Sequence, residues 1–215
     1  MKIRPASDRS LLVTFGDEIS PAAHRDVMRL TQALAGFRGV LNLHPAFSSV
    51  LVDFDPRRIG HAAMEQAVRE RFQAAGEAPP QDARVVELPV RYGGDCGPDL
   101  AEVARLHDLT PERVVELHSA AAYEVWFLGF ATCFPYLGGL PPELVTPRLE
   151  APRKRVAAGS VAIGGSQAGV YPLPSPGGWR IIGRTAVRLF DPEAVPPPLL
   201  RMGDRVRFRP VEVLV

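Results

Sequence analysis

Arginines and glycines stand close together between residues 146 and 187, where they could bind a small anion. Arg153 precedes the pair Gly177-Gly178, and Arg184 directly follows Gly183. A guanidinium group can donate two parallel hydrogen bonds to a carboxylate or phosphate. Glycine lets a ligand approach the main-chain N–H groups closely. This combination predicts a site for a small anionic or amide-bearing ligand.

Four further polar side chains are candidates for the same site. The amide of Gln167 could donate to a ligand carbonyl, the hydroxyl of Tyr136 could reach a pocket mouth, and Thr185 adjoins Arg184. His118 titrates near neutral pH and could act as an acid or base, or bind a carboxylate. We predict catalytic roles for His118 and Arg184. The predicted substrate-binding residues are Arg153, Gln167, Gly177, Gly178, Tyr136 and Thr185.

Each candidate also has a purely structural interpretation. His118 could stabilise the C-terminus of a helix, Tyr136 could be a packed aromatic, and Gln167 could occupy a turn. Arg184 could be a surface residue at a strand end, and glycine-rich and proline-rich strands are also what the corners of a small barrel need. The sequence leaves both interpretations open.

Composition and cysteine usage exclude several classes of protein. The 215 residues carry 25 basic and 24 acidic side chains, and this balance argues against nucleic-acid binding. No apolar run approaches membrane-spanning length and no secretory signal is evident, so we expect a cytoplasmic protein without a membrane partner. Cys96 and Cys133 form no metal-binding or disulfide pattern. We expect no metal site, and the glycine spacing of residues 92–97 is not that of a P-loop.

The first part of the chain predicts a small α+β domain over residues 1–80. Strands are expected near residues 11–15, 40–44 and 49–54, after an extended start. Ser20-Pro21 can cap and start a helix, and a second amphipathic helix is expected over 59–75. The order β-β-α-β-β-α is typical of helices packed on one face of a sheet. Residues 76–82, which are polar and contain prolines, are the predicted domain boundary.

The second part, residues 84–215, predicts a mainly-β barrel with a helical hairpin. Helices are expected from Pro98 and from Thr110-Pro111, and strands near 85–90, 123–128 and 205–210. Short strands separated by glycine and proline follow residue 158, without helices between them, which favours a closed barrel. Residues 130–140, rich in aromatics and glycine, are expected to form a loop.

An ordered set of motifs covers nearly the whole chain. The longest segments are SPGGW at 175–179, IIGRT at 181–185 and FPYLGGL at 134–140, with ELHS at 116–119 and TPRL at 146–149. In this set the chain resembles the B subunit of the bacterial 5-oxoprolinase complex, a family also called allophanate hydrolase subunit 1. The sporulation-kinase inhibitor KipI belongs to the same family.

The resemblance implies a cyclophilin-like fold for the barrel and work within a complex. Its implied partners are a homologous C subunit, which supplies a second barrel, and an A subunit. The implied reaction opens 5-oxo-L-proline to L-glutamate with ATP hydrolysis, although the sequence does not place the ATP site. Phosphorylating the lactam oxygen would activate a poor electrophile, and cationic and main-chain donors would then face the phosphoryl and carboxylate oxygens.

Residues 129–137 depart from the family pattern. Where relatives commonly have G-F-x-P-G-F-P-Y-L, this chain has GFATCFPYL, with Thr132 in place of proline and Cys133 in place of glycine. If that glycine has a positive φ, we expect cysteine to strain the loop. The departure and the KipI branch leave a second interpretation, a regulatory inhibitor that binds a sensor histidine kinase. A prolyl isomerase is a third, suggested only by barrel analogy.

Overall fold

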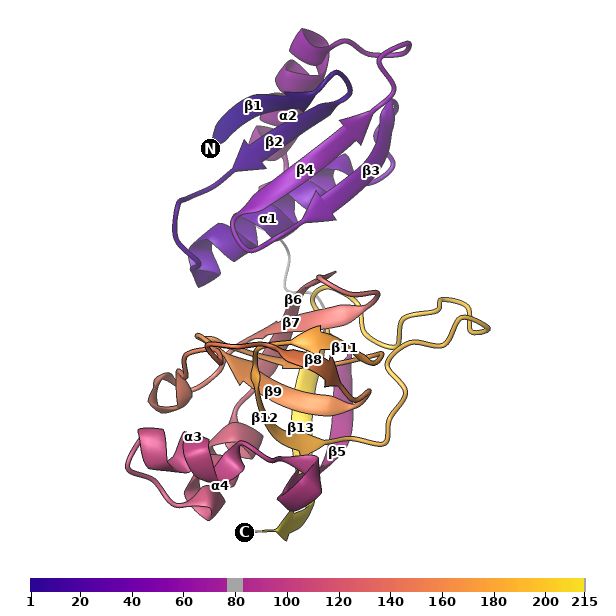
Figure 1. Cartoon of the computed structure of the whole chain (residues 1–215). Helices are drawn as coiled ribbons and strands as arrows, with labels where there is room; N and C mark the ends of the chain where they lie inside the picture. The colour runs from indigo at the N-terminus through magenta and orange to yellow at the C-terminus, as the bar shows by residue number, and fades with distance from the viewer. Residues whose placement is uncertain (77–82, 215) are drawn as a thin grey trace. The chain divides into compact units, whose positions relative to one another are not determined.

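The chain divides into two compact units, residues 1–82 and 83–215. A computed structural model describes residues 1–76 and 83–214, and its elements are labelled in Figure 1. Most of the predicted boundary, residues 77–82, lies outside the described residues. Each unit has its own hydrophobic core, and each is described by itself below.

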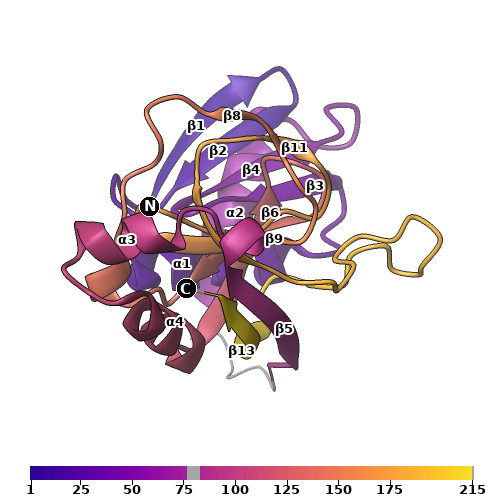
Figure 2. The same cartoon turned by 60° about the horizontal axis from the view of Figure 1, so that its bottom comes forward.

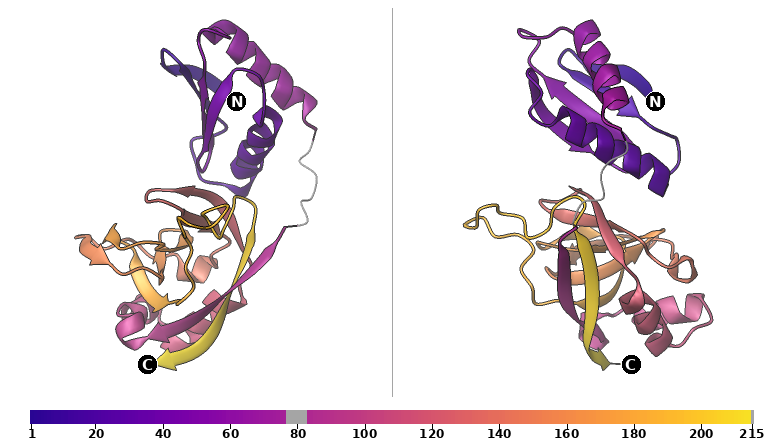
Figure 3. Two further views of the ribbon diagram at one scale, coloured as in Figure 1. Left: turned by 90° about the vertical axis from the view of Figure 1, so that its right-hand side faces the viewer. Right: turned by 180° about the vertical axis from the view of Figure 1, so that it is seen from behind.

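In the first unit two helices cover one face of a four-stranded antiparallel sheet (Figures 1 and 3). The sheet order is β1-β2-β4-β3. Leu11, Val13, Val50 and Val52 alternate along β2 and β4 and bury their side chains in the core of this unit. Its elements are β1 (Lys2–Ser7), β2 (Ser10–Thr14), α1 (Pro21–Leu34), β3 (Val40–Pro45), β4 (Ser49–Phe54) and α2 (His61–Ala74).

The predicted start of the first helix is confirmed. The Ser20 hydroxyl accepts a hydrogen bond from the N–H of Ala23 at 3.1 Å, and Pro21 occupies the first helical position. Thr110 caps the start of α4 in the same way, with the N–H of Arg113 at 3.2 Å. Both helices therefore begin where a capping side chain is followed directly by proline.

The second unit is a closed barrel of seven strands in the order β10-β7-β6-β13-β5-β12-β9. Its first and last strands, β5 and β13, run parallel and side by side (Figures 2 and 3), and the other barrel pairs are antiparallel. The barrel strands are β5 (Val85–Gly93), β6 (Tyr123–Gly129), β7 (Phe134–Gly138), β9 (Ser160–Gly164), β10 (Gln167–Val170), β12 (Arg180–Arg184) and β13 (Arg205–Leu214). The remaining elements are η1 (Gly94–Cys96), α3 (Leu100–Leu106), α4 (Pro111–Ala120), η2 (Pro142–Leu144), β8 (Arg153–Val156) and β11 (Ser175–Gly177).

The prediction of a loop over residues 130–140 is wrong for β7. This strand pairs with β6 from Phe134 to Gly138, and with β10 only at Tyr136 and Leu137. Pro135, which has no N–H to donate, therefore lies where β7 has a neighbour on one side only. Proline and glycine are uncommon inside strands, so the sequence pattern did not predict β7, although this strand pairs with β6 and β10 in the barrel.

Outside the barrel, β8 and β11 form a separate two-stranded sheet. Beside it lies a small cluster of buried residues distinct from the main barrel core, built around Phe134, Tyr171 and Trp179. Two glycines of the barrel strands, Gly164 and Gly169, make room for this cluster. A Cβ at Gly164 would lie 2.4 Å from the Trp179 ring, and one at Gly169 would lie 2.7 Å from the Phe134 ring. These glycines are therefore needed for ring packing.

Candidate functional site

A pocket of about 350 Å³ opens above this aromatic cluster. We call it the aromatic pocket; its principal walls are Phe130, Phe134, Tyr136, Arg148, Tyr171 and Trp179. The rings meet edge to face: Phe134 lies 5.4 Å from Trp179 and 5.1 Å from Tyr171, between ring centroids. Such contacts add to the stabilisation from burial and hold the rings in place. The volume is in the range of small-molecule sites.

Of the predicted site residues, Gly177, Gly178 and Tyr136 line this pocket together. The carbonyl of Gly178 accepts a hydrogen bond from the N–H of Leu149 at 2.7 Å. This hydrogen bond connects Gly178 to the segment that carries Arg148. The pair forms one rim of the pocket, although its role in binding stays a prediction.

The two glycines differ in the space around them. A Cβ at Gly177 would lie 2.1 Å from the buried Tyr171 hydroxyl, whereas one at Gly178 would have ordinary contacts, the nearest at 3.6 Å. We expect Gly177→Ala to destabilise the second unit by about 1–2 kcal/mol, because the Tyr171 ring must shift. Gly178→Ala is the matched control and should leave stability nearly unchanged. Urea unfolding of both variants measures this, and equal stability of the two would contradict it.

Arg148 supplies positive charge to the aromatic pocket. Its guanidinium carbon lies 5.7 Å from the centroid of the Trp179 ring. Burial raises the pKa of the Tyr136 and Tyr171 hydroxyls. The charge of Arg148 partly offsets the pKa rise for Tyr136, whereas for Tyr171 a hydrogen bond from the Trp179 main chain offsets it first, with smaller effects of the charges of Arg148 and Arg153. Both hydroxyls therefore stay protonated at neutral pH and can donate hydrogen bonds. The pocket thus combines apolar walls, two O–H donors and one cation.

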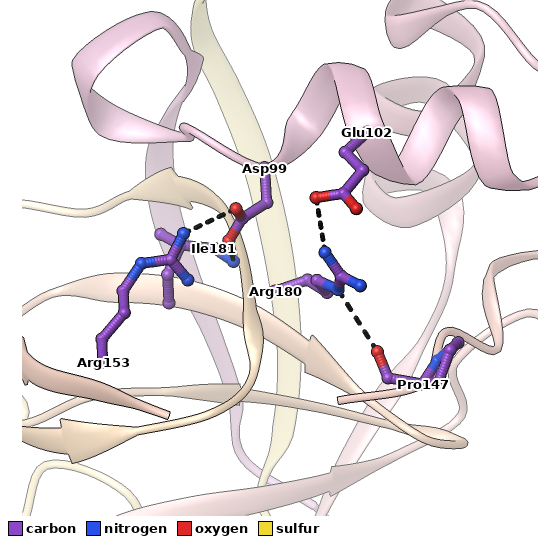
Figure 4. A network of polar contacts seen from close by, with 6 residues as sticks. All are labelled: Asp99, Glu102, Pro147, Arg153, Arg180 and Ile181. Atoms are coloured by element: carbon purple, nitrogen blue, oxygen red, sulfur yellow. Dashed lines mark hydrogen bonds and ion pairs between the residues drawn. The ribbon is translucent and has the colours of Figure 1, made fainter. Parts of the chain in front are cut away.

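Arg153 is held away from this arrangement by an ion pair. One of its Nη atoms donates to Asp99 at 2.6 Å, and the same buried carboxylate accepts the N–H of Ile181 at 2.7 Å (Figure 4). The other Nη is buried without a partner among the described residues. Through β8, Arg153 pairs with Gly177 in the two-stranded sheet. Asp99 therefore fixes Arg153 behind the glycine rim of the pocket, although Arg153 itself is not part of the lining.

Gln167 and His118 lie elsewhere. Gln167 is buried at the start of β10, and its Nε2 has no partner among the described residues. His118 has no exposed surface. Its Nδ1 shares a 2.9 Å hydrogen bond with the Tyr92 hydroxyl, and its ring packs 4.6 Å from that of Phe208, between centroids.

Burial lowers the pKa of His118 to about 3, so the ring is neutral at physiological pH. It lies among the residues of the barrel core and does not line the aromatic pocket. This placement supports a structural role for His118 and gives it no surface from which to contact a substrate. His118 is in the last turn of α4, but a neutral ring carries no charge to stabilise the C-terminus of that helix; its structural role is packing in the barrel core.

Arg184 and Thr185 line a different pocket, between residues 158–159, 172–173 and 184–192. The structure therefore does not bring the predicted catalytic pair together: His118 is in the barrel core and Arg184 faces this second pocket. The cation of the aromatic pocket is Arg148, which was not among the predicted site residues. Arg148 belongs to the TPRL motif at 146–149, but the motif alone gives it no role.

In the loop before β7, the residue that replaces the family's glycine has a positive φ, the case that was considered from the sequence. Cys133 has φ +62° and Phe130 has φ +59°. A left-handed conformation is unfavourable for residues with a Cβ. Phe130 is 65% exposed at the pocket edge, and burial raises the pKa of the Cys133 thiol, which does not favour a nucleophilic thiolate.

We therefore expect Cys133→Gly to stabilise the second unit by about 0.5–1 kcal/mol, since glycine adopts positive φ without a Cβ clash. Cys133→Ala removes the thiol but keeps the Cβ, and should not be stabilising. Urea denaturation of the three proteins tests the difference. Equal stability of the glycine and alanine variants would show that the backbone conformation is not the cause.

Comparison with known proteins accounts for the motif set. The family described as carboxyltransferase domain, subdomain C and D, matches residues 1–200. The chain is 47% identical over 193 residues to the 5-oxoprolinase B subunit of Escherichia coli O157:H7, covering 89% of this chain and 88% of the relative. The B subunit of Bacillus subtilis (strain 168) is 39% identical over 219 residues, with 96% and 91% covered. The chain belongs to the family of 5-oxoprolinase B subunits. The family predicted from the motifs is thus confirmed.

One solved structure that resembles this member of the 5-oxoprolinase B family is longer than the chain. The crystal structure of TTHA0988 is similar with a TM-score of 0.82 and 41% identity, over 95% of this chain but only 40% of that one. In the part of the chain that the structure describes, no helix has the length and apolar character to cross a bilayer. Within the same residues, no group of three or more His, Cys, Asp or Glu could hold a metal ion.

Proposed function

We propose that the chain is the B subunit of an ATP-dependent 5-oxoprolinase complex, which converts 5-oxo-L-proline to L-glutamate together with a C subunit and an A subunit. The observation that carries the proposal is 47% identity, over most of both chains, to a protein named as that component. Both curated relatives described above carry the same name. The enzyme interpretation is therefore preferred to the kinase inhibitor.

The aromatic pocket supports this proposal by its chemistry. 5-Oxoproline is a small ring that carries one carboxylate and one amide. The aromatic walls would cover the faces of the ring, and Arg148 would bind the carboxylate. The hydroxyls of Tyr136 and Tyr171 would donate to the lactam oxygen. Gly177 and Gly178 keep this rim open, because side chains there would narrow it.

ATP supplies the driving force in the proposed reaction. Transfer of its γ-phosphoryl group to the lactam oxygen releases ADP and withdraws electron density from the C–N bond. One water then adds to the activated carbon and the ring C–N bond breaks towards nitrogen, which takes up a proton; this leaves an acyl phosphate. A second water hydrolyses the acyl phosphate to the γ-carboxylate of glutamate and inorganic phosphate. We assign no residue of this chain to ATP, and we expect no turnover by the isolated chain.

Reconstitution tests the proposal. The chain is mixed with the purified C and A subunits from the same organism, 5-oxoproline and ATP, and glutamate and ADP are measured. We expect both products in equal amounts, and none when any one component is omitted. In parallel, the Escherichia coli B subunit is assayed with its own partners. No glutamate from the first mixture while the second is active would refute the proposal.

A further inference from the structure

A second pocket of about 580 Å³ lies on the barrel unit, outside the aromatic pocket. We call it the arginine pocket; the residues that matter here are Gly159, Leu173, Arg184, Thr185, Arg188 and Phe190. Two of these six residues carry guanidinium groups. We propose that this pocket binds the phosphate group of a small organic ligand, with Arg184 and Arg188 as its two cationic contacts.

Arg184 carries an unused donor. Its Nε is buried and has no partner among the described residues. A buried N–H of a charged group without an acceptor is costly, and such groups are nearly always paired. Within residues 1–76 and 83–214, no acidic side chain forms an ion pair with Arg184. An oxyanion in the pocket would satisfy this donor.

Arg188 is exposed, and its ion pair with Asp191 is long, at 3.7 Å. Such a surface pair contributes little free energy, so the guanidinium can turn to a ligand at low cost. Two arginines beside one carboxylate leave a net positive charge. This charge favours a dianion such as a phosphate monoester over a singly charged carboxylate.

Two hydrogen bonds hold the segment that carries Arg184. The N–H of Thr185 donates to the carbonyl of Gly159 at 2.9 Å, and the N–H of Val187 donates to the Thr185 hydroxyl at 3.2 Å. A Cβ at Gly159 would lie only 2.1 Å from the Thr185 carbonyl oxygen. The segment that carries Arg184 is therefore held in place before a ligand arrives, which lowers the ordering cost of binding.

The remaining wall is apolar. Leu173 and Phe190 line the pocket beside the two arginines, and Leu173 is partly exposed. An apolar surface next to a cationic one matches a ligand with an organic part and a phosphate part. Inorganic phosphate would use only the arginines, so the geometry predicts weaker binding for it.

Calorimetric titration of the full chain with phenyl phosphate, inorganic phosphate and benzoate tests the proposal. We expect phenyl phosphate to bind more tightly than either of the others. Arg184→Gln should weaken its binding by about tenfold or more, and Arg188→Gln should also weaken it. Arg155→Gln, on an exposed arginine of β8, is the matched control. The Arg155→Gln chain should bind phenyl phosphate like the unmodified chain.

Ala186→Glu provides a variant that keeps both arginines. Ala186 is exposed and lines the same pocket, so a carboxylate there should repel phosphate without disturbing the core. Circular dichroism confirms folding of each variant. No binding of phenyl phosphate at millimolar concentration, unchanged binding by Arg184→Gln, or equally tight binding of benzoate would each overturn the proposal. Because no turnover is measured, these outcomes do not depend on the 5-oxoprolinase assignment.

Discussion

Arg148→Gln is expected to lower kcat/KM of the reconstituted complex for 5-oxoproline by about tenfold to a hundredfold. A charged hydrogen bond to a ligand contributes roughly 1.5–3 kcal/mol, which corresponds to this range. Arg148 is the cation of the aromatic pocket, and its side chain is exposed, with the Trp179 ring beneath it. The loss should appear mainly in KM, because the carboxylate does not change during ring opening.

The control is Arg155→Gln, which removes the same charge from an exposed position on β8 outside the pocket. Its kinetics should match those of the unmodified complex, and both variants should unfold at the unmodified temperature. If the two substitutions lower kcat/KM equally, the effect is one of net charge and Arg148 does not bind the substrate. An unchanged KM for Arg148→Gln would likewise exclude it.

The second large effect is acid destabilisation of the barrel unit through His118. Burial holds the pKa of His118 at about 3 in the folded state, against 6.5 for an exposed histidine. Above pH 6.5 neither state binds the proton, so the stability is unaffected. Below pH 6.5 His118 binds a proton in the unfolded state but stays neutral in the folded state. The free energy of unfolding therefore falls as the pH falls, by about 2 kcal/mol at pH 5, until the decline ends near pH 3.

Urea unfolding between pH 7.5 and 4.5 measures this slope, and fluorescence reports the barrel unit because both tryptophans, Trp126 and Trp179, belong to it. His118→Phe should flatten the slope. Tyr92→Phe removes the hydrogen bond to His118 but keeps the ring, so it should lower stability at pH 7 and leave the slope in place. An unaltered slope in His118→Phe would show that another group is responsible.

The sequence predicted those parts of the fold that depend on local chemistry. Ser20-Pro21 and Thr110-Pro111 marked two helix starts because capping is read from adjacent residues. The strand β7 was missed because a proline normally argues against a strand. Pro135 fits here because β7 has only β6 as a neighbour at that position, and this pairing is not visible in the local sequence. The closed barrel was predicted from strand length and spacing, whereas its parallel contact between β5 and β13 has no local signal.

The candidate site was predicted less completely. Gly177, Gly178 and Tyr136 do line one pocket. His118 and Arg184 were grouped with them by residue type, and the fold places one in the core and the other in the arginine pocket. Burial and direction of a side chain depend on packing between distant segments, so the type of a residue does not reveal them. Arg148 was overlooked because nothing in its neighbours shows that Trp179 lies beneath it.

The placement of β13 between β5 and β6 has a consequence for the newly made polypeptide. During synthesis on the ribosome, β5 and β6 emerge long before residues 205–214, which form β13. Until then β5 and β6 present main-chain groups with no neighbour on one side, which is the condition under which strands of separate molecules associate. A nascent chain therefore exposes these two strand edges, and with them a site for association with other chains, until residues 205–214 have left the ribosome.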